Sequence, residues 1–537
     1  MEIEKKDTYI GLSIGNFNSV ISVLSAKDGS VNVIANEDGD HKTPTFLAFS
    51  DSELYAGSQA KHQSVYNYRN TIVGFLDHLS SSEVPSSQAD EYKSYSKLVT
   101  LDSKLPGYII TDEDQDTTTQ VSAYSALVQF AQKLKETAVK NIGSDIKGAV
   151  VSVHPHWSKS QTDLFHKAIV EAGLPVIQLI PESSASVLAE NLLDNADDQN
   201  LITINVGATV TDITLSNIRM GLELVVDSIS TNEFCGEKVD LLLMRHFADE
   251  FKRTTSIDVI ADNKPREILK LKYAVQDTKH TIANNTINSA SAPCFIESLS
   301  NGLDFSSKIT KLRFDMLVGK FFAPINSAIT ELLSRCNYSP LEISKVLFVG
   351  GSSQISSKLN NKILNIFPNA SQVVSAHTVD EIVAVGCAKQ AHLIHLNTAI
   401  SYPENVADFT LNLPVSVVEA PIGIKISEDS LLVAVPKNTP LPVVRRLKLS
   451  NSPGSSSAYF PIYLGTANAV PKVDEDSDDE PSVPSPYAPS TLLAEFSLDL
   501  PSDEQTDIEL TFFIDTNKST TITALDLKSM TESSIKI

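Results

Sequence analysis

The sequence repeats one pattern of strand, glycine turn and strand. Residues 10–23 (IGLSIGNFNSVISV) form an apolar alternating segment that is broken at Gly15 and then resumes. Residues 204–213 (INVGATVTDI) align with residues 12–21 (LSIGNFNSVI), with Gly207 on Gly15 and Asn205 on Ser13. Only glycine lets the amide groups of such a turn approach an anion closely. The duplication predicts two related lobes, each of which offers one loop to a shared cleft.

A third glycine loop follows a third strand. Residues 345–349 (KVLFV) read as a buried strand and run directly into Gly350, Gly351, Ser352 and Ser353. Three glycine turns that each follow a strand predict a nucleotide-binding cleft.

The order of these loops resembles that of the DnaK-type (seventy-kilodalton) heat-shock chaperones. Further matches to that family are residues 33–39 (VIANEDG), 42–46 (KTPTF), 70–72 (NTI), 236–237 (GE), 379–381 (VDE) with Gly386, and 438–442 (NTPLP). The resemblance spans essentially the whole chain. It implies a two-lobed α/β actin-like ATPase domain, followed by an all-β sandwich of the kind in which these chaperones hold extended peptides.

A length of 537 residues exceeds what a single core organises, so several domains are expected. The resemblance implies a nucleotide-binding domain over residues 1–400, with lobe I at about 1–190 and 377–400 and lobe II at about 191–376. A linker is expected at 401–421, and a truncated β-sandwich at 422–537. The sequence stops where the sandwich of the family ends, so we expect no helical lid.

Periodicity supports particular elements. Helices are expected at 124–138, at 161–172 with Gly173 as its end, and at 314–332 with a kink or restart at Pro324. Strands are expected at 147–153, 222–228, 431–435, 443–449, 508–514 and 520–526. The acidic run within residues 471–490 predicts a disordered, solvated loop, with a docking site for basic partners as the alternative.

Several residues on which hydrolysis depends in this family are replaced. The family uses carboxylates that place magnesium, a lysine near the γ-phosphate, and hydroxyls that orient water. At the matching positions Ser13 and Asn205 replace carboxylates, Leu76 replaces the lysine, and Asn16, Phe17 and Val210 replace threonines. The acidic residues Glu182, Asp212 and Glu237 remain. The resemblance therefore implies a pseudo-ATPase that binds ATP but hydrolyses little or none of it, with no catalytic residue, no assigned metal ligand, and Mg²⁺ left open.

Binding depends more on the backbone, and most positions that match nucleotide contacts persist. We predict that ATP is contacted by Gly15, Asn16, Phe17, Gly207, Ala208, Thr209, Gly236, Glu237, Lys279, His280, Ala283, Gly350, Gly351, Ser352, Gln354 and Asp380. Within this set His280 and Gln354 replace two arginines that sandwich the adenine in the family, and Ala283 replaces a ribose contact. The alternative is a relic cleft without nucleotide.

Histidine and cysteine patterns suggest no metal centre. His154 and His156 have no acidic or thiol partner at ligand spacing in the sequence, so we expect surface or packing residues. The four cysteines, Cys235, Cys294, Cys336 and Cys387, contain no Cys-x-x-Cys pair, which favours reduced packing residues.

The formal net charge of -23 argues against direct binding of nucleic acid, and no segment is apolar and long enough for a membrane. Within the family, the resemblance is greatest to atypical ribosome-associated members. It implies a cytoplasmic subunit of a ribosome-associated complex: a stable heterodimer with a zuotin-like J-domain protein that reaches the ribosome through this partner. Such a subunit stimulates a conventional heat shock protein 70 in nascent-chain folding; its own contact with the nascent polypeptide stays open.

Two alternatives belong to other classes. One is an active ATP-driven folding chaperone with its own peptide-binding cycle. The other is a sugar kinase of the same superfold, which fits the loops but not the C-terminal sandwich.

Overall fold

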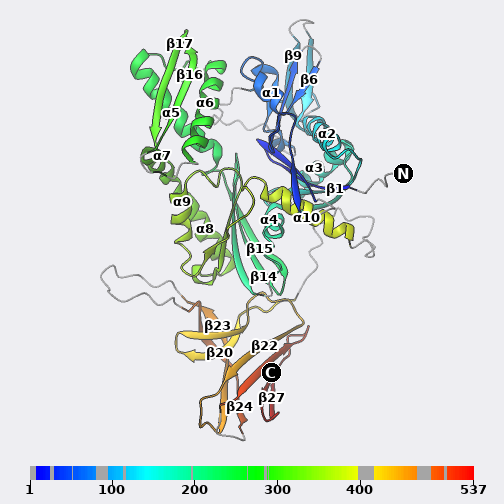
Figure 1. Ribbon diagram of the computed structural model, residues 1–537, viewed down its shortest axis with the longest axis vertical. Coiled ribbons are helices and arrows are strands. Elements are labelled where there is room, and N and C mark those ends of the chain that lie inside the picture. Colours follow the sequence, from blue (N-terminus) through cyan, green and yellow to red (C-terminus); the bar gives the residue numbers. More distant parts are fainter. Residues whose placement is uncertain are drawn as a thin grey trace.

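The computed structural model describes residues 8–24, 30–50, 53–79, 95–103, 105–112, 117–194, 197–262, 264–283, 287, 290–396, 416–468, 485–500 and 505–537. Figure 1 shows two α/β lobes above a body made of strands. Residues 401–415 of the predicted linker and residues 471–484 of the predicted acidic loop lie outside the described residues. The prediction of a loop up to residue 490 is wrong, because residues from Tyr487 onward belong to a strand.

Each lobe contains a central sheet, and the two sheets have the same strand order. In lobe I the order is β12-β11-β1-β2-β3, with β4 on β2, and in lobe II it is β19-β18-β13-β14-β15. Each duplicated hairpin is antiparallel, and its first strand pairs in parallel with a later strand. Leu12 lies opposite Ile21 and Ile204 lies opposite Ile213, so the predicted duplication is confirmed residue by residue.

The lobe I strands are β1 (Thr8–Ile14), β2 (Asn18–Leu24), β3 (Val31–Ile34), β4 (Thr43–Pro44), β11 (Ile146–Val153) and β12 (Val176–Pro181). Those of lobe II are β13 (Gln199–Val206), β14 (Thr211–Arg219), β15 (Leu222–Thr231), β18 (Lys345–Val349) and β19 (Ser371–Gln372). The outer part of lobe I adds β5 (Phe46–Ser50), β6 (Glu53–Ala56), β7 (Thr71–Val73), β8 (Leu98–Thr100), β9 (Pro106–Asp112) and β10 (Thr117–Ser122), and that of lobe II adds β16 (Ser291–Ser300) and β17 (Leu303–Thr310).

The helices predicted from periodicity are confirmed. In lobe I, α2 (Ala123–Ile142) begins after the Ser122 side chain accepts from the Ser125 amide, and it ends at Gly143 in the left-handed region. The next helix, α3 (Lys159–Glu171), packs beside it on the outer face of the lobe I sheet (Figure 1). Short helical turns complete this lobe: α1 (Ser58–Gln63), η1 (Tyr68–Asn70) and η2 (Phe75–His78).

The lobe II helices are α5 (Gly236–Thr255), α6 (Pro265–Ala283), α7 (Lys311–Val318), α8 (Phe322–Cys336) and α9 (Ser357–Leu364), with the turns η4 (Gly319–Phe321) and η5 (Pro340–Glu342). The stripe predicted over 314–332 is thus divided into α7 and α8. Pro324 lies in the first turn of α8, so the predicted restart is confirmed.

Two helices lie between the central sheets, α4 (Glu182–Ala189) and α10 (Ile382–Leu396) (Figure 1). They cross closely, because a Cβ on Gly386 would stand 1.7 Å from the Ala185 carbonyl oxygen. Apolar residues of both helices share one buried cluster with strands of both lobes. The two lobes are therefore joined through a common core.

The C-terminal body consists of two four-stranded sheets, β21-β20-β23-β24 and β22-β25-β26-β27. The strands are β20 (Ile422–Ser427), β21 (Ser430–Val435), β22 (Val443–Ser450), β23 (Ser457–Ala467), β24 (Tyr487–Asp499), β25 (Asp507–Ile514), β26 (Thr520–Asp526) and β27 (Glu532–Lys536). The four strands predicted by alternation are β21, β22, β25 and β26, and their inward residues form one buried cluster.

This sandwich contacts lobe II through side chains. Arg219, at the end of β14, donates from Nε and Nη2 to the Lys437 carbonyl oxygen at 3.2 and 3.0 Å. Arg445 Nη2 donates to Asp198 Oδ1 at 2.7 Å, and the buried Tyr487 hydroxyl donates to Glu342 Oε1 at 2.6 Å. The sandwich and lobe II are thus held together by several polar contacts.

Candidate functional site

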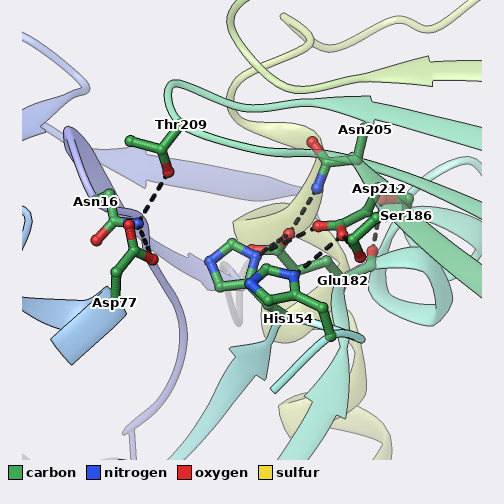
Figure 2. Close-up of polar contacts among 10 residues, drawn as sticks. Asn16, Asp77, His154, Glu182, Ser186, Asn205, Thr209 and Asp212 are labelled. Atoms are coloured by element: carbon green, nitrogen blue, oxygen red, sulfur yellow. Dashed lines mark hydrogen bonds and ion pairs between the residues drawn. The ribbon is translucent and has the colours of Figure 1, made fainter. Parts of the chain in front are cut away.

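The two duplicated glycine turns have the same geometry and face each other. The Gly15 amide donates to Asn18 O at 3.1 Å, and the Gly207 amide donates to Val210 O at 2.9 Å. A Cβ on either glycine would stand 2.8 Å from that carbonyl oxygen, so the turn requires glycine. Asn16 Nδ2 donates to Thr209 Oγ1 at 3.1 Å, which connects the turns of the two lobes (Figure 2).

The third loop and the start of α5 gather around the second turn. The Gly236 amide donates to Gly207 O at 3.0 Å, the Glu237 amide to Ala208 O at 2.9 Å, and the Ser352 amide to Val206 O at 3.1 Å. A Cβ on Gly236 would stand 2.4 Å from Ser352 Oγ. Gly350 has φ +85° and Gly351 follows it, so the loop turns back toward β13. The structure therefore brings these predicted residues together.

The remaining predicted residues lie around this centre. On α6, Lys279 Nζ is 2.6 Å from Asp240 Oδ1, and both side chains are buried. Before α10, Asp380 Oδ2 is 2.6 Å from Lys42 Nζ. His280 and Ala283 lie on the last turn of α6, while Gln354 is exposed in the loop before α9. The charges of Lys279 and Asp380 are thus already paired with protein groups.

Two of the predicted replacements, Phe17 and Leu76, pack within lobe I. The Phe17 ring contacts the Phe46 ring edge-on, with centroids 5.3 Å apart. Because a phenyl ring has no hydrogen-bond donor, Phe17 cannot supply the hydroxyl group of the threonine that it replaces. Leu76 is fully buried in the lobe I core. The next residue, Asp77, accepts from Asn16 Nδ2 at 2.7 Å and brings a carboxylate to the first turn. Sequence reasoning missed Asp77, although it directly follows the position of the family lysine.

A cluster of ionisable groups lies beside the turns, between the lobes (Figure 2). His154 Nδ1 is 3.0 Å from Glu182 Oε2 and 3.7 Å from Asp212 Oδ2. His156 Nδ1 is 3.1 Å from Asp212 Oδ1, and Asn205 Nδ2 donates to Glu182 Oε2 at 2.5 Å. Both carboxylates are therefore engaged by side chains of this chain.

The charges in this cluster stabilise one another. Burial opposes protonation of His154, but Glu182 and Asp212 raise the pKa of its imidazole well above the ordinary value. Burial alone would raise the pKa of Asp212, but contacts with His154 and His156 lower it. The two carboxylates thus favour the protonated form of His154, and the two imidazoles favour the ionised form of Asp212.

Surface or packing residues were predicted at His154 and His156, and an acidic partner from elsewhere in the chain was not anticipated. The partner, Asp212, lies 56 residues after His156 in the sequence and on the other lobe. Because β11 runs parallel to β1, the loop after β11 lies at the same edge of the sheet as the first glycine turn. The four cysteines are free thiols, as predicted, and Cys235, Cys294 and Cys387 are buried.

The duplicated sheets, the facing turns and the helices between the lobes define an actin-like ATPase domain. The chain belongs to the Hsp70 family, since the family model described as "Hsp70 protein" matches residues 9–472.

Its relatives include both general and ribosome-associated members. A heat shock protein 70 homolog of Schizosaccharomyces pombe is 29% identical over 92% of this chain and 89% of its own length. Heat shock 70 kDa protein 14 of Danio rerio is 31% identical over 84% of this chain and 86% of its own. Ribosome-associated complex subunit SSZ1 of Saccharomyces cerevisiae is 27% identical over 97% of this chain and 98% of its own.

Members of this family bind ATP, typically with Mg²⁺. Glycine turns of this kind can bind a phosphate chain through main-chain amides, and neither Gly15 nor Gly207 admits a Cβ. The donor set for Mg²⁺ does not fit. Mg²⁺ requires oxygen ligands in octahedral geometry. Here the two carboxylates, Glu182 and Asp212, face imidazoles and an amide instead.

In the part of the chain that the structure describes, no helix has the length and hydropathy needed to cross a membrane.

Proposed function

We infer that this chain is an atypical Hsp70-family chaperone that binds ATP with little or no hydrolysis. It acts as a cochaperone subunit, paired stably with a J-domain protein at the ribosome, and stimulates a conventional Hsp70 there. The observation that carries the inference is the chemistry of the cleft: the backbone turns are kept, whereas the charges that hydrolysis needs are replaced or engaged.

Binding rests on main-chain groups. The phosphates of ATP would be held by the turns at Gly15–Phe17, Gly207–Thr209 and Gly350–Ser352, with Gly236 and Glu237 behind them. The nucleoside would lie near Lys279, His280, Ala283, Gln354 and Asp380. Bound ATP would also stabilise the folded protein relative to the unfolded chain.

Several charged groups that support hydrolysis in the family are replaced in this chain. Removing one preorganised donor from such a site lowers a rate by about 100- to 1,000-fold. At the lysine position Leu76 is buried, and the adjacent Asp77 adds a negative charge near the first turn. With Ser13 and Asn205 in place of carboxylates as well, turnover should fall to the background rate.

Partner and location are inferred from the relatives and from the charge. SSZ1, a ribosome-associated complex subunit by name, aligns over nearly the whole of both chains. A protein of Saccharomyces cerevisiae named as a ribosome-associated molecular chaperone aligns over 98% of this chain. A net charge of -23 repels RNA, so a basic partner, here a zuotin-like J-domain protein, would carry this chain to the ribosome in the cytoplasm.

The test of the first part is a single-turnover assay with purified protein and radiolabelled ATP. We expect bound ATP to remain intact over hours, with no acceleration by a J-domain. A J-domain-stimulated release of phosphate would overturn the inference.

That same outcome would favour an active folding chaperone. The feature that supports this second candidate is the sandwich of two four-stranded sheets, because conventional members hold peptides in such a domain. Saturable binding of an apolar peptide that is released by ATP would support it further.

The partner is tested separately. Protein isolated from a cytosolic extract at moderate salt should carry a J-domain protein in a fixed ratio, together with ribosomes. Removal of that J-domain protein should abolish ribosome association. Ribosome binding by this chain alone would contradict the proposed route.

A further inference from the structure

The proposed binding of ATP does not use His154 or His156, which lie beside the glycine turns. The ligand atoms of His154, His156 and Asp212 all lie within 4.8 Å of one another. His156 Nδ1 is 3.1 Å from Asp212 Oδ1, and His154 Nδ1 is 3.7 Å from Asp212 Oδ2. Ligands in a tetrahedral site with bonds of about 2.0–2.1 Å are about 3.3 Å apart, so each imidazole already lies near ligand spacing from one oxygen of Asp212.

The local sequence explains why the two rings lie together. His154 and His156 flank Pro155 in the turn that follows β11, which the Trp157 amide closes by donating to His154 O at 3.3 Å. Their centroids are 5.3 Å apart. Asp212 is the second residue of β14 and approaches from the other lobe.

A second observation points to a missing ligand. Both ring nitrogens of His154 are buried, and within the described residues neither makes a hydrogen bond of acceptable geometry. Nδ1 is nevertheless 3.0 Å from Glu182 Oε2, which places a further oxygen beside the same nitrogen. His154 Nε2 thus has no hydrogen-bond partner among the described residues, and Nδ1 faces carboxylate oxygens without a well-aligned hydrogen bond, so this imidazole retains the capacity to bind a metal ion.

The donor types select the class of ion. Two imidazoles and one carboxylate suit Zn²⁺ and its neighbours in the transition series, whereas Mg²⁺ prefers oxygen alone. We propose that His154, His156 and Asp212 bind a divalent transition-metal ion of the zinc class that joins the two lobes. This site goes beyond the proposed function, because it requires neither ATP nor a partner.

The protein contains its own reporter for this site. Trp157 is the only tryptophan in the chain, and its ring centroid is 5.0 Å from that of His154. We expect Co²⁺, added to nucleotide-free, chelator-treated full-length protein, to quench Trp157 fluorescence saturably. Zn²⁺ should then displace Co²⁺ and restore the signal, and Mg²⁺ at the same concentration should do neither. Absence of saturable quenching, or equal competition by Mg²⁺, would overturn the proposal.

Variants separate this site from other histidines. His156→Ala removes a partly exposed ring, and Asp212→Asn keeps the side-chain volume. Each should lower Co²⁺ affinity at least about tenfold. His62→Ala, on the exposed face of α1, is the matched control and should bind Co²⁺ like the parent. Unchanged affinity in both site variants would overturn the proposal, and metal-free thermal unfolding shows whether each variant is folded.

The claim that the metal ion joins the two lobes can be tested separately. Zn²⁺ should slow amide hydrogen exchange both in the loop after β11, in lobe I, and in β14, in lobe II. Protection on one side alone would contradict the joining of the lobes.

Discussion

Leu76 and Asp77 show how two neighbouring residues change the character of the cleft. Leu76 belongs to the lobe I core and packs in the same cluster as Phe75, so its side chain is enclosed by apolar neighbours. Asp77 presents a carboxylate to Asn16 instead. At the predicted position of the family lysine and the residue after it, this chain has a buried apolar side chain and a carboxylate.

Restoring the lysine should therefore fail to restore hydrolysis. Leu76→Lys would place an ammonium group in an apolar core, and we expect a loss of roughly 3 to 5 kcal/mol in unfolding free energy. Urea denaturation measures this loss, and Leu76→Met, which should cost less than about 1.5 kcal/mol, is the control. A stable Leu76→Lys protein that releases phosphate would refute our account of the cleft.

Asp77 is expected to weaken the binding of polyphosphate. Asp77→Asn removes one negative charge near the first turn, so ATP affinity at low salt should rise by about tenfold, equivalent to about 1.4 kcal/mol. Calorimetric titration measures it. Asp102→Asn, which alters an exposed carboxylate bonded to Gln120, should leave ATP affinity unchanged. Equal effects of the two substitutions would show that only net charge matters.

At the scale of elements, the sequence predicted those helices and turns that residues close together in the sequence determine. Period and capping residues identified α2 and α3, and the glycine turns were identified because each turn constrains its own backbone. The position of α10 could not be predicted from such signals. Its residues from Ile382 to Ala388 are all buried, so no polar face marks its orientation between the sheets.

The histidine cluster escaped prediction for a related reason. His154 and His156 are adjacent to one strand, whereas Asp212 belongs to a hairpin of the other lobe. The contact exists only after two separately folded sheets come together. Sequence spacing carries no record of it.

The crossing of α4 and α10 should be sensitive to a single methyl group. Gly386→Ala would place a Cβ 1.7 Å from the Ala185 carbonyl oxygen, and the helices would have to separate. We expect a loss of about 3 kcal/mol. Gly319→Ala, which has no neighbour within 4 Å, should change stability by less than about 1 kcal/mol. Thermal unfolding of the two variants tests this, and similar melting temperatures would contradict the close crossing.

At the scale of the molecule, the sandwich and lobe II behave as joined bodies. Asn438 Nδ2 donates to Asn217 Oδ1 at 2.9 Å and to the Tyr338 hydroxyl at 3.0 Å. Lys437 Nζ lies 4.1 Å from the centroid of the Tyr338 ring and donates to Asn337 O at 2.8 Å. These contacts come from the NTPLP segment and the lysine before it, which sequence analysis recognised only as a family motif.

Two adjacent arginines on β22 allow a matched test of this docking. Arg445 pairs with Asp198 of lobe II, and both side chains are largely buried. Arg446, whose side chain is 67% exposed, faces Glu509 within the sandwich. Arg445→Met should weaken docking by about 1 to 3 kcal/mol and raise the rate of proteolysis between the domains. Arg446→Met should have little effect, and equal proteolysis of the two variants would exclude a role for the Arg445 contact.

The polar contacts of the sandwich described above all end on lobe II. A protein that binds the sandwich would therefore hold lobe II directly. It would reach lobe I only through the buried core that the two lobes share.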